Sequence, residues 1–256
     1  MKIPRYAFFL GGRDLEMCEI GNLLHQLKNG GDGRIAEIYD KKLAWGACVS
    51  DFEHEVNSAI NDKLIPVLLE LECDIDIPDY AIEIDHHGAR TGEPSALFQL
   101  FTLLDLPKKQ WTRHYALVDA NDRGHIAEMR KIGASDVELV AIRKADRSAQ
   151  GISEDEEKSG LRALDKVELA CDASLLVVRL PHERTATVSD PLALSGETRD
   201  LLVLCPRSTH FFGRGDRIMR LDQCFSGGWR GGLLPERGFW GLPKRLGFDA
   251  VINVFS

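Results

Sequence analysis

Short apolar runs, each followed by glycine, aspartate or other polar residues, recur along the first half of the chain. Runs of about four to eight apolar residues bounded by turn residues are typical of buried strands. Between them, apolar residues recur at helical spacing, as in the segment from Leu15 to Leu27, which ends at Gly30-Gly31. The alternation predicts an α/β fold with a mostly parallel sheet flanked by helices. The predicted strands of this half are 6–10, 34–39, 65–72 and 79–84.

Two later apolar runs, 115–118 and 137–142, predict further strands of the same sheet. A helix is expected over 93–104, because Pro94 suits a first helical turn and apolar residues follow it. Another helix is expected over 125–132, which Gly133 would end.

A polar stretch, 146–158, separates this part from the rest of the chain. Within it, Ser153 followed three residues later by Glu156 forms a capping box that predicts the start of a helix. We therefore predict an α/β domain over 1–145, a linker over 146–158, and a smaller α+β domain over 159–256. The strands predicted in the second domain are 174–180, 185–188, 201–205, 217–221 and 250–255.

Composition narrows the class of protein. The 256 residues are 44% hydrophobic and 28% charged, which is enough for a packed core. A formal net charge of −8 argues against a protein that grips long duplex nucleic acid. No stretch approaches the roughly 20 apolar residues of a membrane span, and the run 6–10 is too short for a signal peptide. The six cysteines lack metal-finger spacing, so we expect reduced thiols in a soluble, cytoplasmic protein.

The residues that indicate chemistry most clearly are Asp85, His86 and His87, which directly follow the strand ending at Ile84. A carboxylate and imidazoles form a mixed donor set suited to Mn²⁺, Fe²⁺, Zn²⁺ or, less comfortably, Mg²⁺. In open α/β sheets, ligands gather at the carboxyl ends of strands, which is where this triplet is predicted to lie. The alternative is a surface turn with two solvated histidines.

Other carboxylates also follow predicted strands. Asp14 lies after the first strand and is either a metal ligand or only the N-cap of the next helix. Glu70 and Glu72 lie at the end of the third strand, where they either join the site or belong to a solvated acidic loop. Asp122 follows the run 115–118, and its alternative role is to cap the next helix.

The sequence Ile84-Asp85-His86-His87 after a strand resembles the DHH phosphoesterase superfamily, which is named for that triplet. Its members are two-domain, metal-dependent exopolyphosphatases, inorganic pyrophosphatases, single-strand exonucleases, and oligonucleotide or cyclic-dinucleotide phosphodiesterases. Asp14 matches the second aspartate of the family's first motif, but Gly12 stands where the first should be. Asp122-Arg123-Gly124-His125-Ile126 is similar to the motif Asp-Thr-Gly-x-Phe. Gly227-Gly228-Trp229 resembles the Gly-Gly-Gly-His loop of the C-terminal domain, with tryptophan in place of histidine.

The resemblance implies roles for individual residues. The catalytic residues are expected to be His86 and His87, where His87 either supports the ligands or acts as an acid toward the leaving group. Mn²⁺ is the first expected metal, with Mg²⁺, Fe²⁺ or Zn²⁺ as alternatives, and the expected ligands are Asp14, Asp85, His86, Asp122, Glu70 and Glu72. The expected substrate contacts are Arg90, Arg123, Gly227, Gly228 and Arg230.

The function expected from this resemblance is metal-dependent hydrolysis of a phosphoester or phosphoanhydride in a small nucleotide, oligonucleotide or polyphosphate. Divalent metals suit this reaction because they neutralise the substrate's charge and lower the pKa of bound water. The expected partner is a phosphorylated small molecule or short single-stranded nucleic acid, with no membrane and no stable duplex DNA. One alternative is a DHH-like protein that binds a nucleotide or anion without hydrolysing it, which Gly12 and Trp229 favour. Another is an unrelated metallohydrolase in which the triplet is coincidental.

Overall fold

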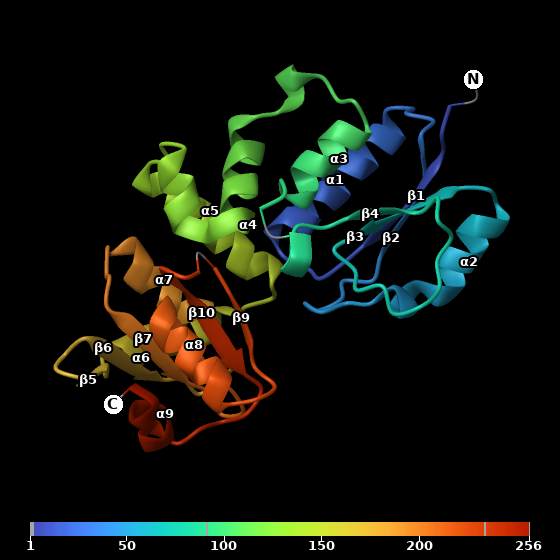
Figure 1. Ribbon diagram of the computed structural model, residues 1–256. Helices are drawn as coiled ribbons and strands as arrows, with labels where there is room; N and C mark the ends of the chain where they lie inside the picture. The colour runs from blue at the N-terminus through green and yellow to red at the C-terminus, as the bar shows by residue number, and fades with distance from the viewer. Residues whose placement is uncertain (1–2, 91, 233, 256) are drawn as a thin grey trace. The chain divides into compact units, whose positions relative to one another are not determined.

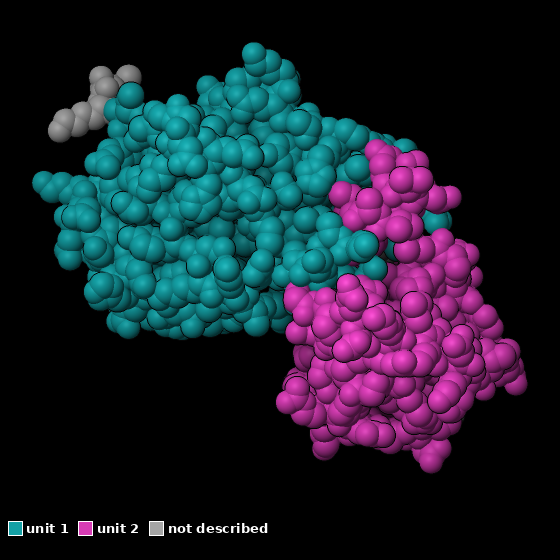
Figure 2. Space-filling view, turned by 180° about the vertical axis from the view of Figure 1, so that it is seen from behind, with its two compact units in different colours: residues 1–134, 144–150 teal, residues 135–143, 151–256 magenta. Residues whose placement is uncertain are grey.

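The chain is seen in a computed structural model, which describes residues 3–90, 92–232 and 234–255. The contacts between its elements divide it into two compact units, coloured separately in Figure 2: residues 1–134 with 144–150, and residues 135–143 with 151–256. Each unit is built around a sheet of its own. The predicted architecture, an α/β part followed by a smaller α+β part, is confirmed. None of the helices in the described residues is both long and apolar enough to span a bilayer.

The first unit contains four parallel strands in the order β2-β1-β3-β4 (Figure 1). Helices α1 and α3 lie on one face of this sheet and α2 on the other. The central strands are therefore apolar on both faces, as parallel strands covered by helices usually are. The bounds are β1 Tyr6–Leu10, β2 Ile35–Asp40, β3 Ile65–Leu69, β4 Ile82–Ile84, α1 Leu15–Asn29, α2 Glu53–Asn61, α3 Ala96–Leu103 and α4 Arg113–Lys131. Short 3₁₀ turns lie at Val49–Phe52, Gly88–Arg90 and Lys108–Gln110.

The second unit contains six strands in the order β5-β6-β7-β8-β10-β9. Only β6 and β7 pair in parallel, and helix α7 connects them; the other neighbours are antiparallel. Alternate residues of β7 enter different cores, since Leu201 and Val203 pack with α6 and α7 whereas Leu202 packs with α8 and α9. The bounds are β5 Glu168–Ala170, β6 Leu175–Arg179, β7 Asp200–Leu204, β8 Thr209–Arg214, β9 Trp229–Gly231, β10 Arg237–Leu242, α6 Glu154–Leu164, α7 Ala186–Leu194, α8 Gly215–Cys224 and α9 Phe248–Phe255.

Five segments predicted to be strands are helical instead. They are 115–118 in α4, 137–142 in α5 (Asp136–Ala149), 185–188 at the start of α7, 217–221 in α8 and 250–255 in α9. A short apolar run does not by itself distinguish a buried strand from the buried face of a helix. In α4 a local interaction favours the helix: the Thr112 hydroxyl caps it by accepting a hydrogen bond from the Tyr115 amide. In α8, Ile218 and Leu221 are fully buried at helical spacing.

The region predicted as a linker, 146–158, takes in the end of α5 and the start of α6. The predicted capping box is confirmed, since the Ser153 amide donates to Glu156 Oε2 at 2.8 Å and the Glu156 amide donates back to Ser153 Oγ at 3.3 Å. The division of the chain into domains 1–145 and 159–256 with separate functions stays a prediction. Four strands of the second sheet, β5, β8, β9 and β10, had no counterpart in the sequence prediction.

Helix α6 approaches α7 closely at Gly160. A Cβ atom at this position would lie 2.4 Å from Thr187 Oγ1 and 2.5 Å from Thr187 Cβ. We therefore expect Gly160→Ala to lower the free energy of unfolding by about 1–3 kcal/mol, the usual cost of overpacking. Gly247→Ala is the matched control, because a Cβ atom there meets nothing within 4 Å. Chemical denaturation measures both variants; equal stabilities would show that α6 and α7 do not pack this closely.

Candidate metal centre

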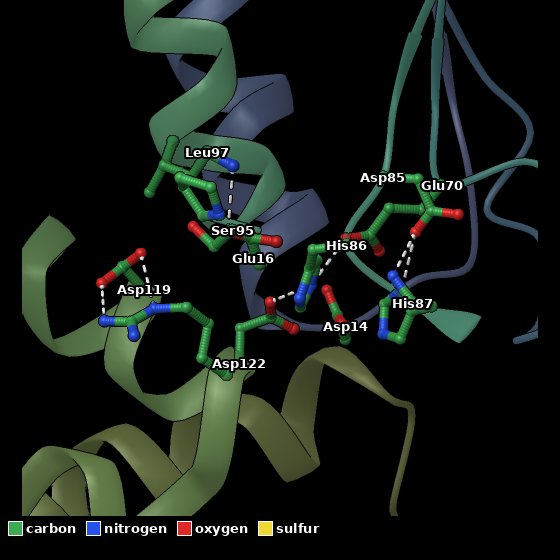
Figure 3. A network of polar contacts seen from close by, with 12 residues as sticks. Asp14, Glu16, Glu70, Asp85, His86, His87, Ser95, Leu97, Asp119 and Asp122 are labelled. Carbon is green, nitrogen blue, oxygen red and sulfur yellow. Dashed lines mark hydrogen bonds and ion pairs between the residues drawn. The ribbon is translucent and has the colours of Figure 1, made fainter. Parts of the chain in front are cut away.

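Four side chains converge at the carboxyl end of the first sheet: Glu16, Glu70, His86 and Asp122 (Figure 3). One potential ligand atom from each lies within 4.8 Å of the others. His86 Nε2 lies 2.6 Å from Asp122 Oδ2 and 3.2 Å from Glu70 Oε1, and all three side chains are at most 9% exposed. We call these four residues the acidic cluster.

The first turn of α1 supplies Glu16 and places Asp14 beside the cluster. Glu16 is 1% exposed, and its Oε1 accepts a hydrogen bond from the Leu97 amide at 3.0 Å. Asp14 is the N-cap of α1, since its Oδ1 accepts from the Met17 amide at 2.8 Å. The N-cap role of Asp14 is thus confirmed, while its role as a metal ligand stays a prediction. Burial and the charges of Glu70 and Asp122 raise its pKa well above the usual range. The sequence prediction missed Glu16; its position at a helix start after a strand, next to Asp14, was the available signal.

Glu70 reaches the cluster through an unusual backbone conformation at the end of β3. Its φ of 52° lies in the left-handed region, which costs a residue other than glycine about 1–3 kcal/mol. Its amide donates to the Ile84 carbonyl at 2.8 Å, which ties this turn to β4. The residue after the neighbouring strand β1, Gly11, packs closely against this turn. A Cβ atom at Gly11 would lie 2.4 Å from the Glu70 carbonyl oxygen.

The chain packs too closely around Gly12 for a side chain to fit there without movement of the backbone. A Cβ atom at this position would lie 2.8 Å from Trp45 Cα and 3.1 Å from the Ala44 carbonyl oxygen. Both contacts are to backbone, which cannot move aside as the end of a side chain can. A side chain at Gly12 would therefore require the backbone of 44–45 to move.

The prediction from sequence that Asp122 lies in a loop after a strand is wrong. Asp122 lies in helix α4. The helix is interrupted directly after it, where Gly124 and His125 leave helical geometry and His125 has a φ of 53°. One turn earlier, Asp119 pairs with Arg123, with Oδ2 and Nη2 2.7 Å apart. Asp122 enters the cluster, whereas Asp119 does not belong to that group of donors.

Asp85 and His87 interact with each other beside the cluster. Asp85 Oδ1 lies 3.0 Å from His87 Nδ1 and also accepts a hydrogen bond from the His87 amide at 2.9 Å. The rings of His86 and His87 are 4.3 Å apart, and one atom of His87 lies within 4.8 Å of ligand atoms of Glu70 and His86. Glu72 is exposed, with its amide bonded to the Ala47 carbonyl. Among the described residues, neither Asp85 nor Glu72 belongs to a group of donors as close as the acidic cluster.

The three arginines expected to contact substrate each face a carboxylate. Arg90 pairs with Glu83 at 2.8 Å, Arg123 pairs with Asp119, and Arg230 in the second unit pairs with Asp222 at 2.9 Å. All three arginine side chains are more than a third exposed. The pairs of Arg90 and Arg230 are exposed enough to contribute little, about 0–1 kcal/mol. Arg123 is held more firmly, because it donates two hydrogen bonds to Asp119, which is only 14% exposed.

The donor set fits a divalent cation. Several carboxylates are buried together, and each buried negative charge is costly unless a cation or hydrogen bonds compensate it. Within the described residues, four of the buried side-chain atoms that lack a well-aligned hydrogen bond are Glu16 Oε2, Glu70 Oε1, His86 Nε2 and Asp122 Oδ2. These are atoms that point at one another, and one shared cation would satisfy all of them.

Without a cation, protons take its place. Burial raises the pKa of Glu16 well above its usual range, and the charges of Asp122 and Glu70 raise it further. Burial alone would lower the pKa of His86, but its contacts with Asp122 and Glu70 outweigh that effect and raise it to about 10. The metal-free cluster therefore holds protons at neutral pH that a metal must displace.

Comparison with known proteins gives a fold and no family. No family model matches the sequence, and no curated protein is significantly similar to it. Among solved structures, an exopolyphosphatase-related protein from Bacteroides fragilis matches with a TM-score of 0.53 at 12% identity, over 99% of this chain and 90% of that one. This likeness shows the fold. RecJ from Thermus thermophilus, solved with Mn²⁺, matches at a TM-score of 0.48 and 10% identity over 98% of this chain and 51% of its own, a likeness too weak to carry an argument.

The protonated cluster predicts how stability depends on pH in protein stripped of metal. A His86 pKa of about 10 in the folded state, against 6.5 ordinarily, stabilises the fold fully below pH 6.5, and this contribution is lost as the pH rises toward 10. The raised pKa values of Asp14 and Glu16 act in the same direction. Each 1 kcal/mol lost lowers Tm by about 2–4 °C in a protein of this size.

Thermal unfolding in chelator between pH 6.5 and 10 measures this effect. His86→Gln should flatten the profile, whereas His87→Gln, at a ring 47% exposed, should leave it steep. If the parent protein were equally stable across that range, the proposed proton-holding contacts of His86 would be wrong.

The site also predicts which carboxylate matters for metal binding. Glu16→Gln keeps the side-chain shape but removes a buried charge, so we expect Mn²⁺ affinity to fall by more than about tenfold, at least the loss seen when a ligand's outer partner is removed. Glu72→Gln removes the same charge from an exposed position and should change the affinity by less than about twofold. Titration calorimetry distinguishes them, and a larger loss in Glu72→Gln would move the site away from Glu16.

Proposed function

We propose that the protein is a metal-dependent phosphoesterase that cleaves a phosphoester or phosphoanhydride in a small nucleotide, oligonucleotide or polyphosphate. The observation that carries the proposal is the convergence of three carboxylates and one imidazole with their buried atoms unsatisfied. The fold shared with an exopolyphosphatase-related protein supports it. Metal chemistry is assigned to residues 1–145 and substrate binding to 159–256, and the reduced thiols favour the cytoplasm as the place of action.

A bound divalent metal would supply a Lewis acid and lower the pKa of bound water to about 7. Glu16, Glu70, His86 and Asp122 would hold it, with Asp14 next to them and Asp85 as a further ligand implied by the family resemblance. A set of hard oxygen donors with one imidazole suits Mn²⁺ best, with Mg²⁺, Fe²⁺ and Zn²⁺ as alternatives.

In the proposed reaction, His87 is the acid that gives a proton to the leaving oxygen of the substrate. Its Nδ1 faces Asp85, which fixes the ring and leaves Nε2 as the nitrogen that can give a proton to a leaving oxygen. The ring lies against His86 and is 47% exposed, so it is accessible to a substrate and close to the cluster. Asp85 is then a positioning residue for His87 as well as a candidate ligand.

An anionic substrate needs positive or donor groups beside so many carboxylates. Arg90 and Arg123 supply guanidinium groups in the first unit. The exposed pair of Arg90 with Glu83 is weak enough to exchange for a phosphate. We also assign Gly227, Gly228 and Arg230 of the second unit to substrate binding, since glycines allow backbone amides to approach an anion closely.

A second candidate function is binding of a nucleotide or anion without hydrolysis. Two observations favour it: the backbone of 44–45 excludes an aspartate at Gly12, and Trp229 stands in the place of the family's loop histidine. A single-metal site that holds a phosphate but does not activate water would fit both.

Hydrolysis assays on Mn²⁺-loaded protein test the proposal, with panels of oligonucleotides, cyclic dinucleotides, pyrophosphate and polyphosphate as substrates. Asp122→Asn removes a buried charge from the cluster, so kcat should fall by at least about 100-fold, comparable to the loss of other electrostatic contacts in active sites. Asp62→Asn, at an exposed position after α2 and outside the cluster, should retain activity within a few-fold.

Hydrolysis by the parent protein that is lost in Asp122→Asn and retained in the control variant supports the phosphoesterase proposal. Stoichiometric binding of a substrate without turnover would establish the second candidate instead. Equal activity of the two variants would place the catalytic centre elsewhere in the chain.

A further inference from the structure

A second convergence of metal-binding side chains lies in the second unit, at the carboxyl ends of the parallel strands β6 and β7. Glu183 follows β6, Cys205 directly follows β7, and His210 lies on β8. One ligand atom of each lies within 4.8 Å of the other two. Cys205 is fully buried, and Glu183 and His210 are half-buried. Three segments that are distant in sequence thus bring a thiol, an imidazole and a carboxylate to one place.

The Ser208 hydroxyl lies at the point where these atoms meet. Its oxygen is 2.8 Å from His210 Nε2, bonds closely to Glu183 Oε2, and also contacts the Cys205 thiol. A hydroxyl has one proton and two lone pairs, so it can donate to Glu183 while accepting from the other two. The three potential ligands therefore already surround one small polar position.

Two of the ligands are held in place from outside this position. The Arg207 amide donates to Glu183 Oε1 at 2.9 Å, which leaves Oε2 to face Ser208. The His210 ring packs edge-on against Trp229, with centroids 5.8 Å apart. Fixing of ligands by outer partners is characteristic of metal sites, because it orients the donor atoms before the metal binds.

The chemistry of the set selects the kind of metal. Thiolate, imidazole and carboxylate together are typical zinc ligands, whereas the acidic cluster of the first unit contains no thiol. A thiolate and a carboxylate also balance the two charges of Zn²⁺, so the occupied site would be neutral.

We propose that Glu183, Cys205 and His210 form a Zn²⁺ site, with the Ser208 hydroxyl or a water molecule in the fourth position. The site joins the turn after β6, the end of β7 and strand β8, so its role is to fasten one end of the second sheet. It does not rest on the phosphoesterase proposal, whose metal-binding residues lie in the first unit and whose assigned residues of the second unit, Gly227, Gly228 and Arg230, are not ligands here.

Titration of the chelator-treated, full-length protein with Co²⁺ tests the site. Cobalt replaces zinc in such sites, and a thiolate ligand gives an intense charge-transfer absorption that oxygen and nitrogen ligands do not give. We expect the band to saturate with one thiolate-bound Co²⁺ per chain, in addition to any Co²⁺ taken up by the acidic cluster, and we expect Zn²⁺ to remove it. His86→Gln, which alters the acidic cluster, should leave the band unchanged.

The variants decide which residues bind. Cys205→Ser should abolish the band, while Cys224→Ser, at an exposed cysteine of the same unit, should retain it. Glu183→Gln keeps the thiol and should weaken Co²⁺ binding by more than about 100-fold, beyond the loss typical of an outer partner. Ser208→Ala keeps all three ligands and should retain the band.

Circular dichroism of each metal-free variant verifies that it has folded, and Glu183→Gln alone tests the site if Cys205→Ser does not fold. Absence of the band in the parent protein would overturn the proposal. So would a band that persists in Cys205→Ser, or an undiminished affinity in Glu183→Gln.

Discussion

The first unit depends on the cost of burying several negative charges in one place. Glu16, Glu70 and Asp122 surround His86 where little water reaches them. In the absence of a cation, protons and the His86 imidazolium reduce the repulsion, which explains why the pKa values of Glu16 and His86 are raised. A fold would not keep such an arrangement for stability alone, because apolar side chains of similar size would pack there at lower cost.

The local backbone shows how the fold accommodates this cost. Glu70 is held in the left-handed region by its hydrogen bond to β4, and Gly11 leaves room for the Glu70 carbonyl. The first turn of α1 presents its positive end to Asp14 and Glu16, which favours negative charge there. Strain and charge thus concentrate at the same edge of the sheet, as is common at functional sites.

The sequence predicted well what depends on local pattern. Buried strands with clear ends, such as β1 and β3, and the capping box at Ser153 could be identified because their signals lie within a few residues. Predictions failed where tertiary packing determines the secondary structure. The short apolar runs of α8 and α9 were predicted as strands, but such a run fits the buried face of a helix equally well. Glycine-rich strands such as β10 were missed because glycine has low strand propensity, and their close cross-strand packing appears only in the folded sheet. Part of the candidate site could be predicted from the sequence: His86 and Asp122 through the family resemblance, and Glu70 from its place at the end of a strand. Glu16 was missed, because its position in the site depends on the Leu97 amide, 81 residues away in sequence.

The ligands of the acidic cluster are spread along the chain from Glu16 to Asp122. A metal that binds all four closes loops over more than 100 residues of sequence, so it acts as a reversible cross-link whose effect on chain entropy resembles that of a disulfide. During synthesis, α4 is made last of the contributing elements. The complete site therefore cannot load before most of the first unit has left the ribosome, and a truncated chain that ends before α4 would be unable to retain the metal.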